Sequence, residues 1–182
     1  TDANSIWGGG LRQDLTLGLK SDYTRYVGDR HTIKMGVDFM LLRLREDFSF
    51  DPRENETDLE PFDFRGRNTG GQAGAYVQDL VRLVPGLTAN LGVRFDEYDM
   101  TTRGWGLSPR ANLAYAFDKG RTVLHFAYNR FFSPPPIENQ LLSAFLGFEG
   151  LPPQIMRSNH FEAGANRSIG SLAVVRVTGY WR

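Results

Sequence analysis

Four very short turns alternate with three longer connections along this chain, and the segments between them carry apolar residues at every second position. The short turns are 27–30, 85–86, 118–121 and 169–171. The longer connections run approximately over 51–71, 100–107 and 133–158. In an up-and-down meander, odd and even connections fall at opposite rims, so all the short turns would share one rim. Outer-membrane β-barrels are organised in this way.

Eight segments between these connections have the alternation of strands. The fourth, 87–96, is the clearest, because Leu91, Val93 and Phe95 alternate with polar residues or glycine, namely Asn90, Gly92, Arg94 and Asp96. The others are approximately 11–26, 32–50, 72–84, 109–117, 122–132, a seventh around 161–166 and an eighth that begins near Leu172 with an ambiguous phase. The pattern predicts an all-β fold: an antiparallel up-and-down transmembrane β-barrel segment of about eight strands.

Fully charged residues lie on the polar face of these strands, and they indicate whether the apolar face contacts lipid or a protein core. In 11–26, Arg12, Asp14, Lys20 and Asp22 share the face opposite the leucines. A soluble β-sandwich would have to hide such charges at a free-energy cost of kcal/mol each. A membrane barrel instead turns its apolar face to lipid, lines its lumen with the polar face and closes so that no backbone group is left unpaired.

Aromatic residues gather near the predicted strand ends, where amphipathic rings suit the headgroup levels of a bilayer. The alternative interpretation is that they are ordinary core or rim residues of a sandwich. They are Tyr23, Tyr26, Phe48, Phe50, Phe95, Tyr98, Phe117, Phe131 and Phe132.

Composition excludes several other classes. The 21 Lys plus Arg equal the 21 Asp plus Glu, so no net field recruits nucleic acid. No apolar run reaches the roughly 18 residues that a transmembrane helix needs, so a membrane can be crossed only by strands. The chain has no cysteine, opens without an initiator Met or signal peptide and stops within a strand pattern. We expect it to be an internal segment of a longer exported protein.

Four stretches carry a family resemblance. They are Tyr76-Val77-Gln78-Asp79, Leu87 to Asp96 with the sequence LTANLGVRFD, Ser108-Pro109-Arg110, and Tyr128 to Pro135 with the sequence YNRFFSPP. Their succession resembles the barrel of TonB-dependent outer-membrane receptors, with similar YVQD, LGxRYD, SPR and YxxxFxxP stretches. The resemblance covers roughly Gly71 to Trp181, and the earlier strands are similar by pattern only. Phe95 stands where the family often has tyrosine.

The resemblance implies a specific function and a larger assembly. Barrels of this class have 22 strands and a plugged lumen, so all of 1–182 would belong to one barrel domain. It implies a receptor in the outer membrane that takes up a scarce nutrient such as a siderophore, cobalamin, an oligosaccharide or a peptide. The implied partners are membrane lipid, a plug domain of the same protein, the TonB complex that energises transport and the small nutrient ligand. No cofactor is implied.

Candidate site residues lie on the polar face and in the third long connection. Arg94, Asp96 and Tyr98 share a face with Arg110 and Asn112 of the next strand. They could support the plug or line a solute path, but a structural ladder of cross-strand charge pairs is the favoured interpretation.

The third long connection is unusually apolar. Exposed apolar surface often marks an interaction site, which makes Ile137, Leu141, Phe145 and Phe148 candidates for contact with a ligand or partner. Packing of this loop on itself over the barrel mouth is the equally weighted alternative.

Other chemistry has little support. The acidic stretch from Asp51 to Asp63 lacks the spacing and central glycine of a calcium loop and is best interpreted as a solvated surface loop. The three histidines are isolated, and no nucleophile with a base can be assembled, so we expect no enzyme. A small closed eight-stranded barrel with a structural or adhesive role and a soluble sandwich binding module remain the alternatives to a transporter.

Overall fold

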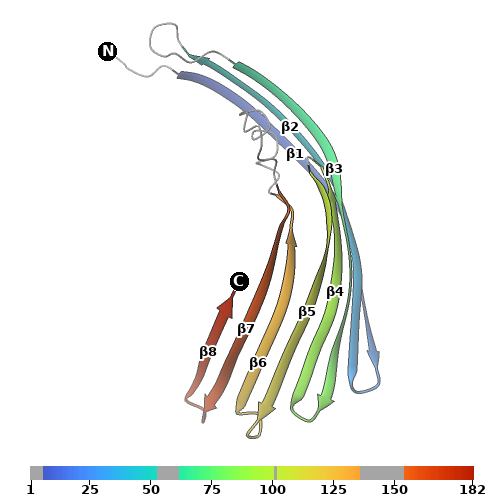
Figure 1. The fold of residues 1–182 in the computed structure, drawn as a ribbon, viewed down its shortest axis with the longest axis vertical. Coiled ribbons are helices and arrows are strands. Elements are labelled where there is room, and N and C mark those ends of the chain that lie inside the picture. The colour runs from blue at the N-terminus through green and yellow to red at the C-terminus, as the bar shows by residue number, and fades with distance from the viewer. Residues whose placement is uncertain (1–5, 53–61, 101, 136–153) are drawn as a thin grey trace, which may run out of the picture.

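The computed structural model describes residues 6–52, 62–100, 102–135 and 154–182, and it forms one curved antiparallel sheet of eight strands (Figure 1). The strands follow one another in sequence order from β1 to β8. This confirms the predicted all-β, up-and-down architecture. The strands are β1 (Ile6–Val27), β2 (His31–Pro52), β3 (Phe62–Val84), β4 (Leu87–Asp99), β5 (Arg103–Phe117), β6 (Thr122–Ser133), β7 (Met156–Ile169) and β8 (Ala173–Trp181).

The four short turns lie together at the lower rim in Figure 1, as the alternation of connections predicts. Each contains a glycine with positive φ: 58° at Gly28, 84° at Gly86, 82° at Gly120 and 57° at Gly170. Glycine adopts this left-handed conformation without the clash that a Cβ atom introduces. The local sequence therefore specifies where each hairpin reverses.

The sheet has two chemically different faces. Residues opposite each other in neighbouring strands point to the same side, so the register assigns each residue to one face. The outer face, as we call it, carries Leu17, Leu41, Val77 and Val93, whose exposed fractions are 61%, 56%, 46% and 40%. The inner face carries the charged residues, Arg94 among them. The described residues form one layer, in which no second sheet covers these leucines and valines.

Several strands are longer than the alternation predicts, β1, β3 and β5 among them. β1 begins at Ile6 instead of about Leu11, β3 at Phe62 instead of Gln72, and β5 at Arg103 instead of Pro109. Much of the second expected long connection is therefore strand. In β3 the added residues do not follow the apolar-outward alternation, since Arg65 and Arg67 are on the outer face and Phe64 is on the inner face, but a long neighbouring strand supplies a continuous hydrogen-bonding ladder. In β3, for example, 62–71 pairs with the far half of β2.

The ends of the sheet remain open in the described part of the chain. Pairings run from β1–β2 to β7–β8, and none joins β8 to β1. The small closed eight-stranded barrel requires that last pairing, so the structure does not support this alternative. Among the described residues, no helix is long and apolar enough to cross a membrane.

Candidate functional site: a polar network on the inner face

Arg94 on β4 is the centre of a charge network that crosses three strands. Its guanidinium Nη2 donates to Asp38 Oδ1 on β2 at 3.0 Å, and Nη1 forms an ion pair with Asp38 Oδ2 at 2.9 Å. Its Nε donates to Asp96 Oδ1 at 2.8 Å. The Arg94 and Asp38 side chains are 23% and 17% exposed, and that of Asp96 is 7% exposed. Arg94 and Asp96, which the sequence places on one face, form an ion pair within β4.

Glycine in the intervening strand allows Arg94 to reach Asp38. Asp38 lies opposite Gly74 of β3, which lies opposite Asp96 of β4. A Cβ atom at Gly74 would lie only 2.2 Å from Arg94 Nη2 and 2.8 Å from Asp38 Oδ2. The guanidinium therefore occupies the space above the glycine.

Tyr76 reaches across a glycine in the same way, two residues nearer to the short turns than Gly74 on β3. It lies opposite Gly36 of β2, which lies opposite Asp22 of β1. The Tyr76 hydroxyl passes over the glycine and donates to Asp22 Oδ1 at 2.7 Å, and Lys20 Nζ lies 3.4 Å from Asp22 Oδ2. A Cβ atom at Gly36 would lie 2.6 Å from both Tyr76 Cε1 and Asp22 Oδ1. Two long polar side chains thus tie together strands that are not neighbours.

The sequence placed Asp22 on the polar face, but it did not identify Asp22 as a partner of Tyr76 or Asp38 as a partner of Arg94. The partners are separated by 54 and 56 residues, and each pair spans an intervening strand. The usable signal is a glycine on the charged face of the middle strand, opposite a carboxylate on one side. That signal can be read only after the register is known.

The other predicted inner-face residues lie on that face but outside the network. Tyr98 is 2% exposed, and its hydroxyl donates to the sulfur of Met100 at 3.7 Å. Arg110 lies opposite Gly92, and Asn112 lies opposite Asn90. Within the described part of the chain, no hydrogen bond or ion pair joins Arg110 or Asn112 to the network. The loop candidates Ile137, Leu141, Phe145 and Phe148 lie outside the described residues.

A second inner-face cluster lies farther from the short turns, where β1, β2 and β3 extend beyond the other strands (Figure 1). Arg12 Nε donates to Glu46 Oε1, and the Glu46 side chain is fully buried. Phe48 and Phe64 stack beside this pair with ring centroids 6.4 Å apart. Together with buried Leu44, they give this part of the inner face both an apolar and a charged component.

These positions correct part of the aromatic prediction. Tyr26, Phe48, Tyr98 and Phe131 fall on the inner face by register, so they do not face lipid headgroups. Rings that do lie on the outer face form contacts across strands. They include Phe95 with Trp105 at 6.2 Å, Tyr128 with Phe161 at 5.0 Å, and Phe161 with Trp181 at 5.8 Å between ring centroids.

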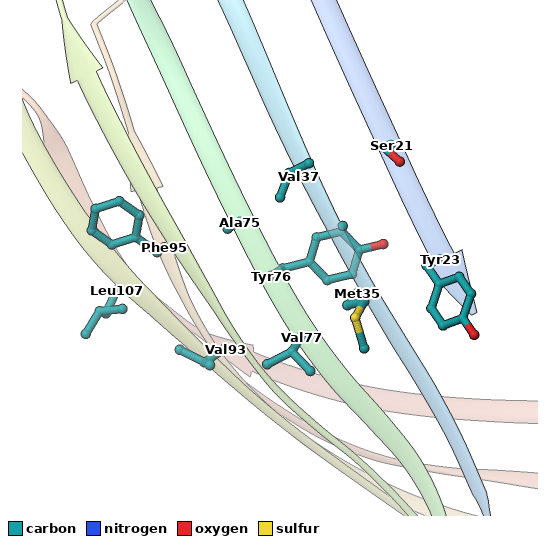
Figure 2. Close-up of a pocket in the computed structure, with 11 residues that line it drawn as sticks. Ser21, Tyr23, Met35, Val37, Ala75, Tyr76, Val77, Val93, Phe95 and Leu107 are labelled. Carbon is teal, nitrogen blue, oxygen red and sulfur yellow. The ribbon is translucent and has the colours of Figure 1, made fainter. Parts of the chain in front are cut away.

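The outer face contains an apolar hollow of about 500 Å³ across β1 to β5. Figure 2 shows Met35 of β2, Val77 of β3 and Val93 of β4 along it, with Tyr23 of β1 at one end and Leu107 of β5 at the other. Apart from the hydroxyl groups of Ser21, Tyr23 and Tyr76, its lining is apolar, and such a surface suits contact with hydrocarbon.

Within the described residues we identify no metal-binding cluster and no nucleophile–base pair. They contain no group of three or more His, Cys, Asp or Glu side chains that could hold a metal ion. His31 Nδ1 lies 2.6 Å from Asp79 Oδ2, and His125 Nε2 lies 3.4 Å from Glu162 Oε1. Each pair stands by itself on the sheet, so neither forms a nucleophile–base arrangement with a third group.

Comparison with known proteins agrees with the barrel geometry. A family model described as "TonB dependent receptor-like, beta-barrel" matches residues 1–182. No curated protein matches the sequence.

Two solved structures are similar in fold. A chain of the FpvAI–pyocin S2 complex aligns with a TM-score of 0.64 and 14% identity over 96% of this chain and 26% of that chain. The alcaligin outer-membrane receptor FauA from Bordetella pertussis aligns with a TM-score of 0.54 and 16% identity over 96% of this chain and 29% of its own. The protein therefore spans less than a third of the length of either neighbour.

Proposed function

Because this chain belongs to the TonB-dependent receptor β-barrel family, we propose that it forms part of the barrel wall of an outer-membrane nutrient receptor and transporter. The whole of 1–182 would lie in one barrel domain of a longer protein in a Gram-negative-type outer membrane. The expected partners are lipid on the outer face, a plug domain on the inner face, the TonB complex and a small nutrient ligand. Proteins of this family are transporters, and we propose no enzymatic role.

The observation that carries the proposal is the inside-out distribution of side chains on one curved layer. Leu17, Val77 and Val93 are exposed on the outer face, while Arg94, Asp38 and Asp96 are paired on the inner face. In lipid the exposed apolar face lowers the free energy of insertion, and in a water-filled or plugged lumen the charges stay solvated or paired.

The inner face also supports a role in holding a plug or guiding a solute. Arg94 is fixed between two carboxylates, so its guanidinium is oriented without support from a ligand. The cluster of Arg12, Glu46, Phe48 and Phe64 combines charge with aromatic surface where the three longest strands extend. We propose that this cluster faces the mouth through which the nutrient enters, with Arg110, Asn112 and Tyr98 lining the path below.

The test uses the complete protein that contains this segment, expressed in otherwise identical host strains with and without functional TonB. Uptake is measured with four labelled probes: ferric alcaligin, cobalamin, a maltodextrin and a hexapeptide. We expect one probe to accumulate only in the strain with TonB. Accumulation that is independent of TonB, or none with any probe despite a folded protein in the outer membrane, would contradict the transport proposal.

A further inference from the structure

The outer face changes from apolar to basic along β2 and β3. On β2, Leu41 is the last apolar outer-face residue, and Arg43 and Arg45 follow it at alternate positions. On β3, Arg67 lies directly opposite Arg45, and Arg65 is two positions farther along on the same face. All four arginines are exposed.

In the outer-membrane barrel proposed above, on which this inference rests, the change marks the outer boundary of the hydrocarbon. The short turns of bacterial outer-membrane barrels lie at the periplasmic rim. By residue number, the arginines lie in the halves of β2 and β3 that are farther from the short turns. The arginine cluster, meaning Arg43, Arg45, Arg65 and Arg67, therefore stands at the headgroup level of the extracellular leaflet.

An apolar groove of about 730 Å³ begins directly below this cluster. Its floor contains Gly71 and Ala73 of β3, and Phe39 and Leu41 of β2 form one wall. Thr69 lines its upper end and lies opposite Arg43 in the register. Because the small residues Gly71 and Ala73 on β3 lie beside the bulky Leu41 and Phe39 on β2, they leave a depression that a lipid chain can fill.

We propose that the groove and the arginine cluster together bind one outer-leaflet lipid that carries acyl chains and more than one phosphate, the chemistry of lipopolysaccharide. Positions two apart on one face are separated by about 6.6 Å along a strand, and neighbouring strands by about 4.8 Å. Four guanidiniums at this spacing extend beyond a single phosphate, which one or two arginines can clamp. The acyl chains then follow the groove toward the middle of the membrane.

The available charge agrees with an anionic headgroup. Arg43, Arg65 and Arg67 form no ion pair with any described residue, whereas Arg45 bonds Asp47 with an Nη2–Oδ2 distance of 2.9 Å. The opposite wall of the groove carries two carboxylates on β4. Arg103 lies 3.3 Å from Glu97 and 3.5 Å from Asp99, which balances part of their charge locally.

The test compares lipid binding by the complete purified protein in phosphatidylcholine vesicles that contain either diphosphorylated lipid A or phosphatidylglycerol. The Arg43→Gln/Arg67→Gln double variant removes two unpaired cations. Loss of two charge-assisted contacts should weaken lipid A binding by about tenfold or more and change phosphatidylglycerol binding much less. Independently, Ala73→Phe should weaken lipid A retention, because the ring fills the groove without changing charge.

Arg25→Gln is the matched control, because Arg25 is an exposed arginine near the periplasmic rim that lies opposite Ile33. It should leave lipid A binding unchanged. Heat-modifiable migration establishes that each variant is folded, and Arg67→Gln alone serves if the double variant is not. Equal loss with Arg25→Gln, unchanged binding in the double variant, or equal binding and loss for both lipids would overturn the proposal. Failed nutrient import with intact lipid A binding would contradict only the transport function.

Discussion

Replacement of Gly74 by alanine should break the bridge between Arg94 and Asp38 without altering either charged residue. The new Cβ atom would lie 2.2 Å from Arg94 Nη2, so the guanidinium has to leave its position above β3. The hydrogen bond of 3.0 Å and the ion-pair contact of 2.9 Å to Asp38 would be lost. The bond to Asp96 can survive, because it is formed by Nε within the same strand.

The magnitude follows from the type and exposure of these bonds. Hydrogen bonds to charged groups contribute roughly 1.5–3 kcal/mol each when well formed, and water in a lumen can replace part of this. Alanine recovers about 0.5–1 kcal/mol over glycine within a strand. We therefore expect Gly74→Ala to lower the free energy of unfolding of the complete protein by about 1–2 kcal/mol. Urea unfolding in detergent micelles, followed by tryptophan fluorescence, measures this difference.

Gly18→Ala is the matched control on the same face. Its Cβ atom would meet Met40 Cγ at 3.6 Å, an ordinary van der Waals contact, so no loss of stability is expected. In an Asp38→Asn background the effect of Gly74→Ala should shrink, because the ionic bridge is already weakened. Equal stability of the Gly74→Ala and Gly18→Ala proteins, or strictly additive effects with Asp38→Asn, would refute this reasoning.

Three further changes test other parts of the fold. Val93→Lys places a charge on the outer face and should raise the free energy of folding into a bilayer by about 2–4 kcal/mol if this position is near the midplane. Asn90→Lys on the inner face should raise it much less. Folding of the two variants from urea into lipid vesicles measures the difference. Gly86→Ala should destabilise the protein more than Gly120→Ala, because both glycines have positive φ but only a Cβ at Gly86 meets a backbone oxygen, at 2.3 Å; unfolding midpoints that are the same would contradict this. Arg94→Lys should lower stability despite the retained charge, because one ammonium cannot reproduce the fork that binds two carboxylates, and a wild-type unfolding midpoint would show that the fork is unimportant.

Much of the fold could be predicted where each strand has one face in lipid. In β4, Leu91, Val93 and Phe95 alternate with polar residues, and both the strand and its outer face are confirmed. The prediction fell short in β3, where 62–71 was assigned to a loop. In this part Arg65 and Arg67 occupy the outer face and Phe64 the inner face, so the apolar-outward alternation that identifies the other strands is absent.

The candidate site was predicted only as a shared face. The alternation placed Arg94, Asp96, Arg110 and Asn112 on the polar side, and the register agrees. It could not show that Arg94 reaches over Gly74 to a residue two strands away. Such a contact depends on the relative alignment of three strands, which no single strand specifies.

The sequence by itself determined the alternation, the positions of the reversals and the family, because lipid exposure, glycine turns and motifs are local properties of the chain. The tertiary structure alone decided the alignment of strands and the network that depends on it. β8 shows the difference: its valines occupy neighbouring positions and leave its phase ambiguous, until pairing of Arg176 with Asn166 and of Val177 with Ala165 assigns each to a face. The physical reason is that a strand's inner and outer sides are defined only by the neighbour to which its backbone is hydrogen-bonded.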